Sequence, residues 1–189
     1  MNRLRGIIIQ SASSQIEKYG FRKFTIDNIA SDLSISKKTV YKYFTSKKTL
    51  IDAVVDYHLE ILSNYVKNIT NNQRSWLEKL EDIFFSYIPK YDPERLLEHM
   101  KELKLYFPEV WEKTERVKII KREQVRKLIY TGLQNGDVSP DLNPAVAILV
   151  FERTMDAVLE EGFLTENNLT PKQAMEAVKD TLLYGILRR

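Results

Sequence analysis

The 189-residue sequence contains no cysteine, and this absence excludes several kinds of site. Disulfide bonds, metal sites with thiolate ligands and a cysteine nucleophile all require that residue. The absence also suits a reducing compartment, and we therefore expect the protein to be cytoplasmic.

Long apolar stretches are also missing. The run from Gly6 to Ile9 ends at Gln10, which makes it too short for the apolar region of a signal peptide. No other stretch approaches the roughly 20 apolar residues that a membrane-spanning helix needs. The sequence thus predicts neither an export signal nor a membrane partner.

Glycine and proline are scarce, with six of each, and they fall between segments of helical periodicity. No segment shows the sustained alternation of apolar and polar residues that is typical of strands. We therefore predict an all-α protein.

Residues that could carry catalysis or bind a metal are few. His58 and His99 are the only histidines, and neither lies in a recognisable motif. Oxygen-bearing residues alternate near residues 137–143 as in a calcium loop, but Leu142 and Ile148 occupy the positions that need glycine and glutamate. No cofactor motif is recognisable either. We accordingly expect no metal, no cofactor and no catalytic residues.

Acidic residues are rare at the start of the chain. The first fifty residues hold 3 Asp and Glu against 10 Lys and Arg, whereas the remaining residues hold 23 against 19. A basic segment joined to a mildly acidic body predicts an anionic partner for that segment, either nucleic acid or a membrane surface. A membrane surface is disfavoured because basic membrane helices expose large apolar faces, whereas the apolar residues here are needed between short helices.

Three helices are predicted within the basic segment. The first ends near Gly20, Thr25 caps a second over residues 26–33, and Ser36 caps a third over residues 37–44. Two short helices joined by a tight turn form the helix-turn-helix pattern, which is typical of DNA-binding proteins.

The third helix separates apolar from basic side chains. Val40 and Phe44 lie one turn apart, so both are predicted to face the core. Lys38 and Lys42 then face outward, with Lys37 and Tyr41 at the edge between the two sides. Lys37 and Lys38 lie at the N-terminal end of this helix, which is the end that reaches base edges in such proteins.

Longer helices follow the basic segment. They are predicted over about residues 47–69, 74–89, 96–103, 108–135, 144–162 and 171–189. The last two begin with a polar cap followed by proline, and their apolar faces are broader than one buried stripe requires. A second subunit that covers part of these faces would explain their breadth.

The segment TIDNIASDLSISKKTVYKYFTSKKTLIDAV, from Thr25 to Val54, carries a family pattern. With its flanking residues it resembles the N-terminal domain of the TetR family of bacterial transcriptional regulators. The matching positions are Thr25, Ile29-Ala30, Ser34-Ile35-Ser36, Thr39-Val40-Tyr41-Lys42-Tyr43-Phe44 and Ser46-Lys47-Lys48-Thr49-Leu50. Ser34 departs from the pattern because a turn glycine is usual there, and serine reaches that backbone conformation only at a cost.

The resemblance implies an all-helical homodimer, paired through its last two helices, that represses transcription by binding a palindromic DNA operator. It divides the chain into a helix-turn-helix domain over residues 1–47 and a ligand-binding and dimerisation domain over residues 48–189. In such a protein a small hydrophobic or amphipathic effector binds the second domain and weakens operator binding. An activating or ligand-independent regulator is the alternative, and a helical enzyme with an unrecognised site is a more distant one.

The expected DNA contacts follow from the helix positions and from the resemblance. Lysine donates to guanine acceptors, which favours base contacts for Lys37 and Lys38. Lys47 lies at a helix N-terminus, where its charge adds to exposed amides that attract a phosphate. The full predicted set is Thr25, Ser36, Lys37, Lys38, Thr39, Tyr41, Lys42, Tyr43 and Lys47.

The expected effector pocket is lined by aromatic and apolar residues of the second domain, a mixture common in small-molecule cavities and equally in plain cores. The predicted set is Phe84, Tyr87, Tyr91, Met100, Tyr106, Phe107, Trp111, Phe151 and Met155. Glu152, Arg153 and Asp156 interrupt an otherwise apolar helix, where they either orient a polar ligand or pair across the dimer interface.

Overall fold

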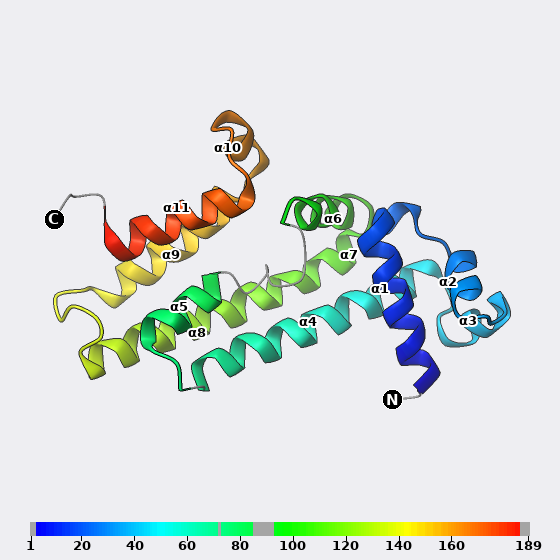
Figure 1. The fold of residues 1–189 in the computed structure, drawn as a ribbon, viewed down its shortest axis with the longest axis horizontal. Helices are drawn as coiled ribbons and strands as arrows, with labels where there is room; N and C mark the ends of the chain where they lie inside the picture. The colour runs from blue at the N-terminus through cyan, green and yellow to red at the C-terminus, as the bar shows by residue number, and fades with distance from the viewer. Residues whose placement is uncertain (1–2, 72, 85–92, 186–189) are drawn as a thin grey trace. The chain divides into compact units, whose positions relative to one another are not determined.

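The computed structural model describes residues 3–71, 73–84 and 93–185, and this part of the chain is helical with no strand (Figure 1). The predicted all-α fold is confirmed. The helices are α1 (Arg3–Lys23), α2 (Ile26–Asp32), α3 (Lys37–Tyr43), α4 (Lys47–Asn71), α5 (Trp76–Phe84), α6 (Pro93–Tyr106), α7 (Pro108–Trp111), the 3-10 helix η1 (Glu112–Thr114), α8 (Glu115–Asn135), α9 (Pro144–Val158), α10 (Glu161–Glu166) and α11 (Pro171–Tyr184). None of the helices in these residues is long and apolar enough to cross a membrane.

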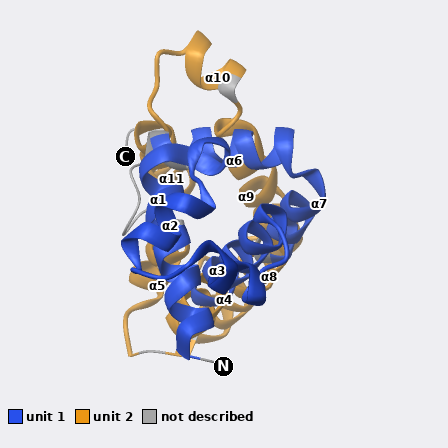
Figure 2. Cartoon of the chain, turned by 90° about the vertical axis from the view of Figure 1, so that its right-hand side faces the viewer, with its two compact units in different colours: residues 1–61, 95–117 blue, residues 62–94, 118–189 orange. Residues whose placement is uncertain are grey.

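The chain forms two compact units (Figure 2). The first unit comprises Met1–Ile61 and Arg95–Val117, and the second comprises Leu62–Glu94 and Lys118–Arg189. The first unit therefore adds α6 and α7 to the N-terminal helices. The predicted domain boundary after residue 47 stays a prediction.

The first unit is built on a continuous apolar core. Ile8, Phe24, Ile29, Val40 and Leu50 are fully buried in it, and each comes from a different helix or connection. Burying a side chain of this size contributes about 1.5–3 kcal/mol. The core thus fixes α2 and α3 against α1 and α4, and the predicted inward orientation of Val40 is confirmed.

The element α1 consists of two helical segments that meet at a kink. Gly20, with φ of 82° and ψ of 168°, is not helical and ends the first segment, and a short second segment runs to Lys23. The carboxylate of Glu102 on α6 accepts a hydrogen bond from the Phe21 amide at 2.8 Å. A Cβ at Gly20 would lie 2.5 Å from that carboxylate, so glycine permits the close approach. The prediction that the first helix ends near Gly20 is therefore confirmed, and a short second segment, started by the contact with Glu102, follows it.

The helix α6 and the 3-10 helix η1 are tied to the N-terminal part of the first unit by polar contacts. Nη1 of Arg22 donates to the Tyr106 hydroxyl at 3.0 Å. The Lys113 amino group lies 2.6 Å from an Asp52 oxygen and 2.9 Å from an Asp56 oxygen. Contacts between residues so far apart in the sequence cannot be predicted from local periodicity.

The single helix predicted over residues 108–135 is instead divided into α7, η1 and α8. The Thr114 hydroxyl donates to the Trp111 carbonyl at 2.7 Å, and a side chain that bonds the backbone in this way competes with helix hydrogen bonds. The rest of the prediction is confirmed, since α8 ends at Asn135 and Gly136 follows with φ of 80°.

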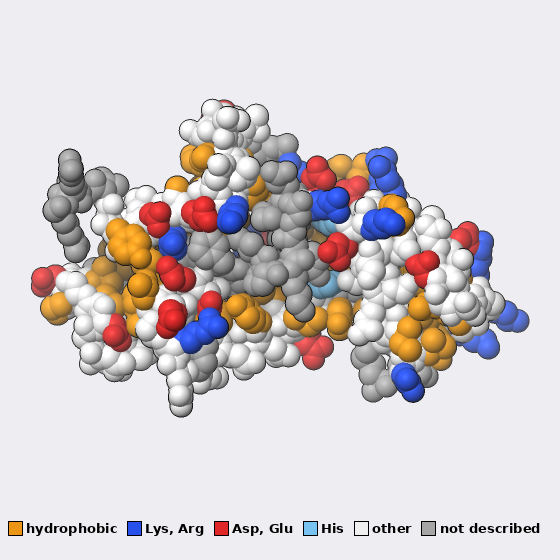
Figure 3. Space-filling model, in the orientation of Figure 1, with side chains coloured by type: hydrophobic (Ala, Val, Ile, Leu, Met, Phe, Trp, Pro, Cys, Tyr) orange, Lys and Arg blue, Asp and Glu red, His pale blue; other side chains and the backbone are white. Residues whose placement is uncertain are grey.

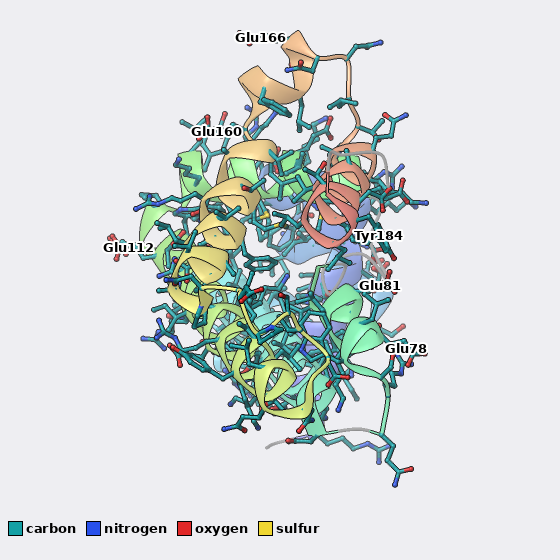
Figure 4. All side chains as sticks on the ribbon, turned by 90° about the vertical axis from the view of Figure 1, so that its left-hand side faces the viewer. Glu78, Glu81, Glu112, Glu160, Glu166 and Tyr184 are labelled. Carbon is teal, nitrogen blue, oxygen red and sulfur yellow. The ribbon has the colours of Figure 1, made fainter. Side chains whose placement is uncertain are left out.

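The second unit contains the C-terminal helices. Nε1 of Trp76 on α5 donates to the Leu128 carbonyl on α8 at 2.7 Å. Lys179 on α11 pairs with Glu81 on α5 at 3.5 Å, and Figure 4 shows Glu81 on α5 beside α11, which ends at Tyr184. These contacts join α5, α8 and α11 within one unit.

Two predicted helices in the second unit end earlier than expected. The helix α9 stops at Val158 instead of near residue 162, and the short α10 follows separately. The last helix stops at Tyr184, because Gly185 takes a φ of 75° and closes it. The caps themselves are confirmed: Asn143 accepts hydrogen bonds from two amides of α9, and Thr170 forms a capping box with Gln173.

Candidate DNA-binding surface

Side-chain caps fix the start of each helix in the helix-turn-helix. Oγ1 of Thr25 accepts a hydrogen bond from the Asn28 amide at 3.1 Å, and Oγ of Ser36 accepts one from the Thr39 amide at 3.1 Å. Ser46 caps α4 in the same way through the Thr49 amide. The predicted caps Thr25 and Ser36 are therefore present, and with Ser46 they determine which residues lie on the first turn of each helix.

The turn between α2 and α3 is closed by Ser34 in a left-handed conformation, with φ of 53°. The Ser34 amide donates to the Ser31 carbonyl at 3.0 Å, and the Ile35 amide donates to the Ala30 carbonyl at 2.9 Å. This pair of bonds is the Schellman arrangement, which usually places glycine at the left-handed position. Serine therefore keeps the geometry that the usual glycine would give.

The outward face of α3 is basic and accessible. Lys37, Lys38 and Lys42 are exposed, and Tyr41 is 47% exposed. We call these four residues the basic surface. Figure 3 shows Lys and Arg side chains gathered along the right-hand edge, where Figure 1 places α2 and α3. Their charge and hydroxyl donors are suited to a polyanion with acceptor groups, as the major groove of DNA presents.

Lys37 differs from its neighbours because it forms an ion pair. Its amino group contacts the carboxylate of Asp27, which lies on the first turn of α2. Within the described part of the chain, Lys38 and Lys42 take part in no ion pair. The first turns of α2 and α3 thus meet through side chains of opposite charge.

Of the remaining predicted contacts, Thr25 and Ser36 are exposed, and the other three are less accessible. Thr39 and Tyr43 are half-buried, and the Thr39 hydroxyl lies 2.9 Å from that of Ser36. Lys47 is turned toward the end of α1: its amino group donates to the Arg22 carbonyl at 2.8 Å and lies 4.3 Å from the centre of the Phe24 ring. Burial lowers the pKa of this amino group from its ordinary value.

The residues predicted for an effector pocket are distributed over both units. In the first unit, Phe107 and Trp111 pack against the N-terminal core, and Tyr106 contacts Arg22. In the second unit, Phe151 and Met155 are half-buried on α9. Met100 is half-buried on α6, whereas the side chain of Phe84 and the residues Tyr87 and Tyr91 lie outside the described part of the chain. The pocket stays a prediction.

The charged residues of α9 pair with α8 inside the second unit. Nε of Arg122 lies 2.8 Å from a Glu152 oxygen, and Nζ of Lys118 lies 3.5 Å from an Asp156 oxygen. These two pairs set α9 against α8. They give Glu152 and Asp156 partners within the same chain, so neither a ligand nor a dimer interface is needed to explain these two acids.

A cavity of about 350 Å³ opens on the second unit where α5 and α8 meet. Basic side chains contribute to its wall, and none of the residues predicted for a pocket does. Its lining residues are Arg74, Ser75, Trp76, Lys79, Lys127, Leu128, Thr131, Asn135 and Asp137.

Two charged residues escaped the sequence reasoning. Lys121 on α8 is only 9% exposed, and burial lowers its pKa well below the ordinary value. It lies four and seven residues before the buried Val125 and Leu128 and therefore on the same side of the helix. This spacing could have indicated from the sequence that Lys121 is buried. Asp27 was the second, and its signal was that it is one of only three acids in the first fifty residues.

The two histidines have packing contacts. Nε2 of His58 lies 2.6 Å from the Ser13 hydroxyl, and burial lowers the pKa of the His58 imidazole. His99 meets the ring of Phe21 edge to face, with centroids 6.1 Å apart. In the described residues, no three His, Asp or Glu side chains gather where they could hold a metal ion.

Comparison with known proteins locates this geometry in a family. The family model of bacterial regulatory proteins, tetR family, matches residues 8–54, which contain α2, α3 and the basic surface. An uncharacterized HTH-type transcriptional regulator of Bacillus subtilis, YvaF, is 26% identical over 174 residues, which cover 90% of this chain and 89% of YvaF. The HTH-type transcriptional repressor KstR2 of Mycobacterium tuberculosis is 22% identical over 196 residues, which cover 100% of this chain and 95% of KstR2.

The fold of the whole chain also has solved counterparts. The structure of the transcriptional regulator FadR from Bacillus subtilis in complex with stearoyl-CoA superposes with a TM-score of 0.65 at 17% identity. The match covers 96% of this chain and 99% of FadR. The similarity thus extends through the helices that follow the helix-turn-helix.

Proposed function

Because this chain belongs to the TetR family of bacterial transcriptional regulators, we propose that it is a homodimeric repressor whose palindromic operator is released when an amphipathic effector binds. The family consists of DNA-binding regulators, which are not enzymes. The proposal adds the direction of regulation, the operator symmetry, the contact residues and the class of effector.

The observation that carries the proposal is the basic surface on α3. Lys37 and Lys38 are the first two residues of the helix, so their donors project from the end that enters the major groove in proteins of this type. Lys42 and Tyr41 follow one turn later and are exposed on the same helix. We assign base contacts to Lys37 and Lys38, and backbone contacts to Thr25, Ser36, Thr39, Tyr41, Lys42, Tyr43 and Lys47.

The test is an in vitro selection of duplex DNA with the purified protein, followed by affinity measurements at several salt concentrations. We expect an inverted repeat with half-sites about one helical turn apart or a multiple of it. Affinity should fall with salt at a slope of about 0.9 per phosphate contacted. Failure to enrich any sequence would contradict the assignment of the basic surface.

An exposed apolar face on α9 supports dimerisation through the last two helices. Val146, Leu149 and Val150 are 56%, 51% and 41% exposed and lie on one side of the helix. Tyr184 at the end of α11 is 56% exposed. A contiguous exposed apolar face is characteristic of a protein interface, and α9 and α11 pack together in the same unit.

The proposed effector combines an apolar body with an acidic group. The FadR structure holds stearoyl-CoA, which has an acyl chain and phosphate groups, and it has the same fold. In this chain, Lys121 on α8 has a buried amino group whose pKa is lowered by burial, and a buried group with a strongly shifted pKa is a candidate for ligand binding. An acidic group placed beside it would favour its charged form. We therefore assign the acidic group of the effector to Lys121 and its apolar part to residues such as Phe151 and Met155.

Operator release in the presence of fatty acids and acyl-CoA thioesters tests this assignment. We expect Lys121→Met to retain operator binding and to raise the effector concentration needed for release at least about tenfold, because a hydrogen bond to a charged group contributes about 1.5–3 kcal/mol. Lys127→Met is the matched control, since Lys127 lies exposed on the same helix and lines the surface cavity. A loss of response in Lys127→Met alone would move the acidic group to that cavity.

A further inference from the structure

The contact between Asp27 and Lys37 places a negatively charged group beside the lysines at the N-terminal end of α3. The two side chains remain 57% and 60% exposed, so solvent or a ligand reaches both. The side chain of Thr25, and not that of Asp27, accepts the hydrogen bond from the Asn28 amide at the start of α2. A carboxylate on the first turn still interacts favourably with the positive end of its helix. Its exposure leaves the carboxylate accessible to a ligand as well.

A carboxylate is unexpected on a surface that is proposed to bind DNA. Helix N-termini attract phosphates, and a carboxylate on the first turn opposes that attraction. It also offsets the positive charge of Lys37. In the described part of the chain, the charges of Lys38 and Lys42 are not offset by an ion pair. A negative group at this place is compatible with DNA where it meets a hydrogen-bond donor, and the base edges supply such donors.

The chemistry of the pair matches one kind of base pair. Guanine presents the acceptors O6 and N7 in the major groove, to which lysine donates. Cytosine presents its N4 amino group, from which aspartate accepts. A carboxylate and an ammonium group held side by side thus have the donor and acceptor order of a G·C pair.

We propose that Asp27 and Lys37 read one G·C base pair in each half-site as a unit, with Asp27 as a specificity-determining residue. This inference rests on the proposed function of the basic surface. On this inference, Asp27 lowers the affinity for non-specific DNA, because its carboxylate repels phosphate. It raises the affinity for a site with cytosine at the matching position, because the carboxylate accepts a hydrogen bond from N4 of cytosine.

Selection of binding sites with wild-type protein, Asp27→Asn and Lys37→Met tests the proposal. We expect the wild type to prefer G·C at one position of the half-site by about fivefold or more, and both variants to reduce that preference below about twofold at the same position. Asp27→Asn should also bind random DNA more tightly, with a salt slope steeper by up to about 0.9 for each subunit.

Asp32→Asn is the matched control. Asp32 is exposed at the other end of α2, where it accepts a hydrogen bond from Gln15, and its replacement removes the same charge from the same helix. We expect this variant to keep the wild-type base preferences at every position. Far-UV circular dichroism of all three variants checks that the fold is retained, which their exposed positions lead us to expect.

The possible results separate the inference from the function on which it rests. If the wild type selects an operator and Asp27→Asn keeps the same base preferences, the inference is overturned while the DNA-binding function stands. The same holds if Asp27→Asn and Lys37→Met relax different positions. If the wild type selects no site, the proposed function fails, and the inference falls with it.

Discussion

Ser34 carries a backbone cost that one substitution would remove. A left-handed conformation costs an L-residue about 1–2 kcal/mol, and glycine avoids this while losing about 0.5–1 kcal/mol through the greater entropy of its unfolded chain. We expect Ser34→Gly to raise the free energy of unfolding by about 0.5 kcal/mol in urea titrations. The φ of 53° at Ser34 is the physical reason.

Asn168 provides the comparison for this prediction. It has a φ of 52°, and the Leu169 amide closes the preceding helix on the Leu164 carbonyl as Ile35 does on Ala30. Asparagine tolerates the left-handed region better than serine, so Asn168→Gly should gain less than Ser34→Gly. Equal gains at the two positions would show that residue type does not matter there.

Lys47 has a structural role that the proposed phosphate contact does not require. Its amino group bonds the Arg22 carbonyl and lies over the Phe24 ring, and burial lowers its pKa. We expect Lys47→Met to reduce the free energy of unfolding by about 0.5 kcal/mol, a small value because the amino group is only partly buried. It should also flatten the salt dependence of DNA binding by about 0.9 for each subunit.

Two measurements on one variant separate these roles of Lys47. Urea unfolding reports the bond to Arg22, and DNA affinity at several salt concentrations reports the phosphate contact. Lys48→Met is a control of equal charge, because Lys48 is the next residue and pairs with Glu109 on α7. An unchanged salt slope in Lys47→Met would leave the residue with a structural role alone.

At the level of helices, the sequence predicted the starts better than the ends. Thr25, Ser36, Asn143 and Thr170 all cap the helices assigned to them, because a cap acts within three residues and its pattern is local. The short segment that follows the kink at Gly20 begins at the Phe21 amide, which is bonded by Glu102 from 81 residues further along the chain. Such a contact leaves no trace in local periodicity.

The same distinction holds for the candidate site. The exposure of Lys38 and Lys42 followed from the apolar spacing of Val40 and Phe44, which are buried as predicted. The ion pair of Lys37 with Asp27 could not be predicted, since it depends on how two helices approach across a turn. Helical periodicity thus gives the face of a residue, and only packing gives its partner.

At the level of the whole molecule, the return of α6 and α7 to the N-terminal unit is the largest feature that the sequence leaves open. Glu102, Tyr106, Glu109 and Lys113 all contact residues of α1 or α4 within that unit. The helix-turn-helix therefore rests on a scaffold drawn from distant parts of the chain. A substitution in α6 or α7 at these contacts would therefore alter the support of the helix-turn-helix without changing a residue of the basic surface.

Dimerisation through α9 gives the last prediction. Leu149 is 51% exposed at the centre of the stripe formed with Val146 and Val150. In a two-fold dimer each substitution occurs twice, and a glutamate buried at such an interface opposes its own copy. We expect Leu149→Glu to weaken the dimer at least about 100-fold while keeping the fold, because a substitution on an exposed surface has little effect on the monomer.

Sedimentation at micromolar concentrations checks this prediction, with Ile119→Glu as the control. Ile119 is 55% exposed on α8, outside the α9 stripe, so the same change there should leave a dimer. The monomeric variant should also lose affinity for an operator with two half-sites, because a dimer links two DNA-binding surfaces and so raises their effective concentration. Its affinity for a single half-site should equal that of the wild type. A dimer that survives Leu149→Glu would place the interface elsewhere than on the exposed stripe of α9.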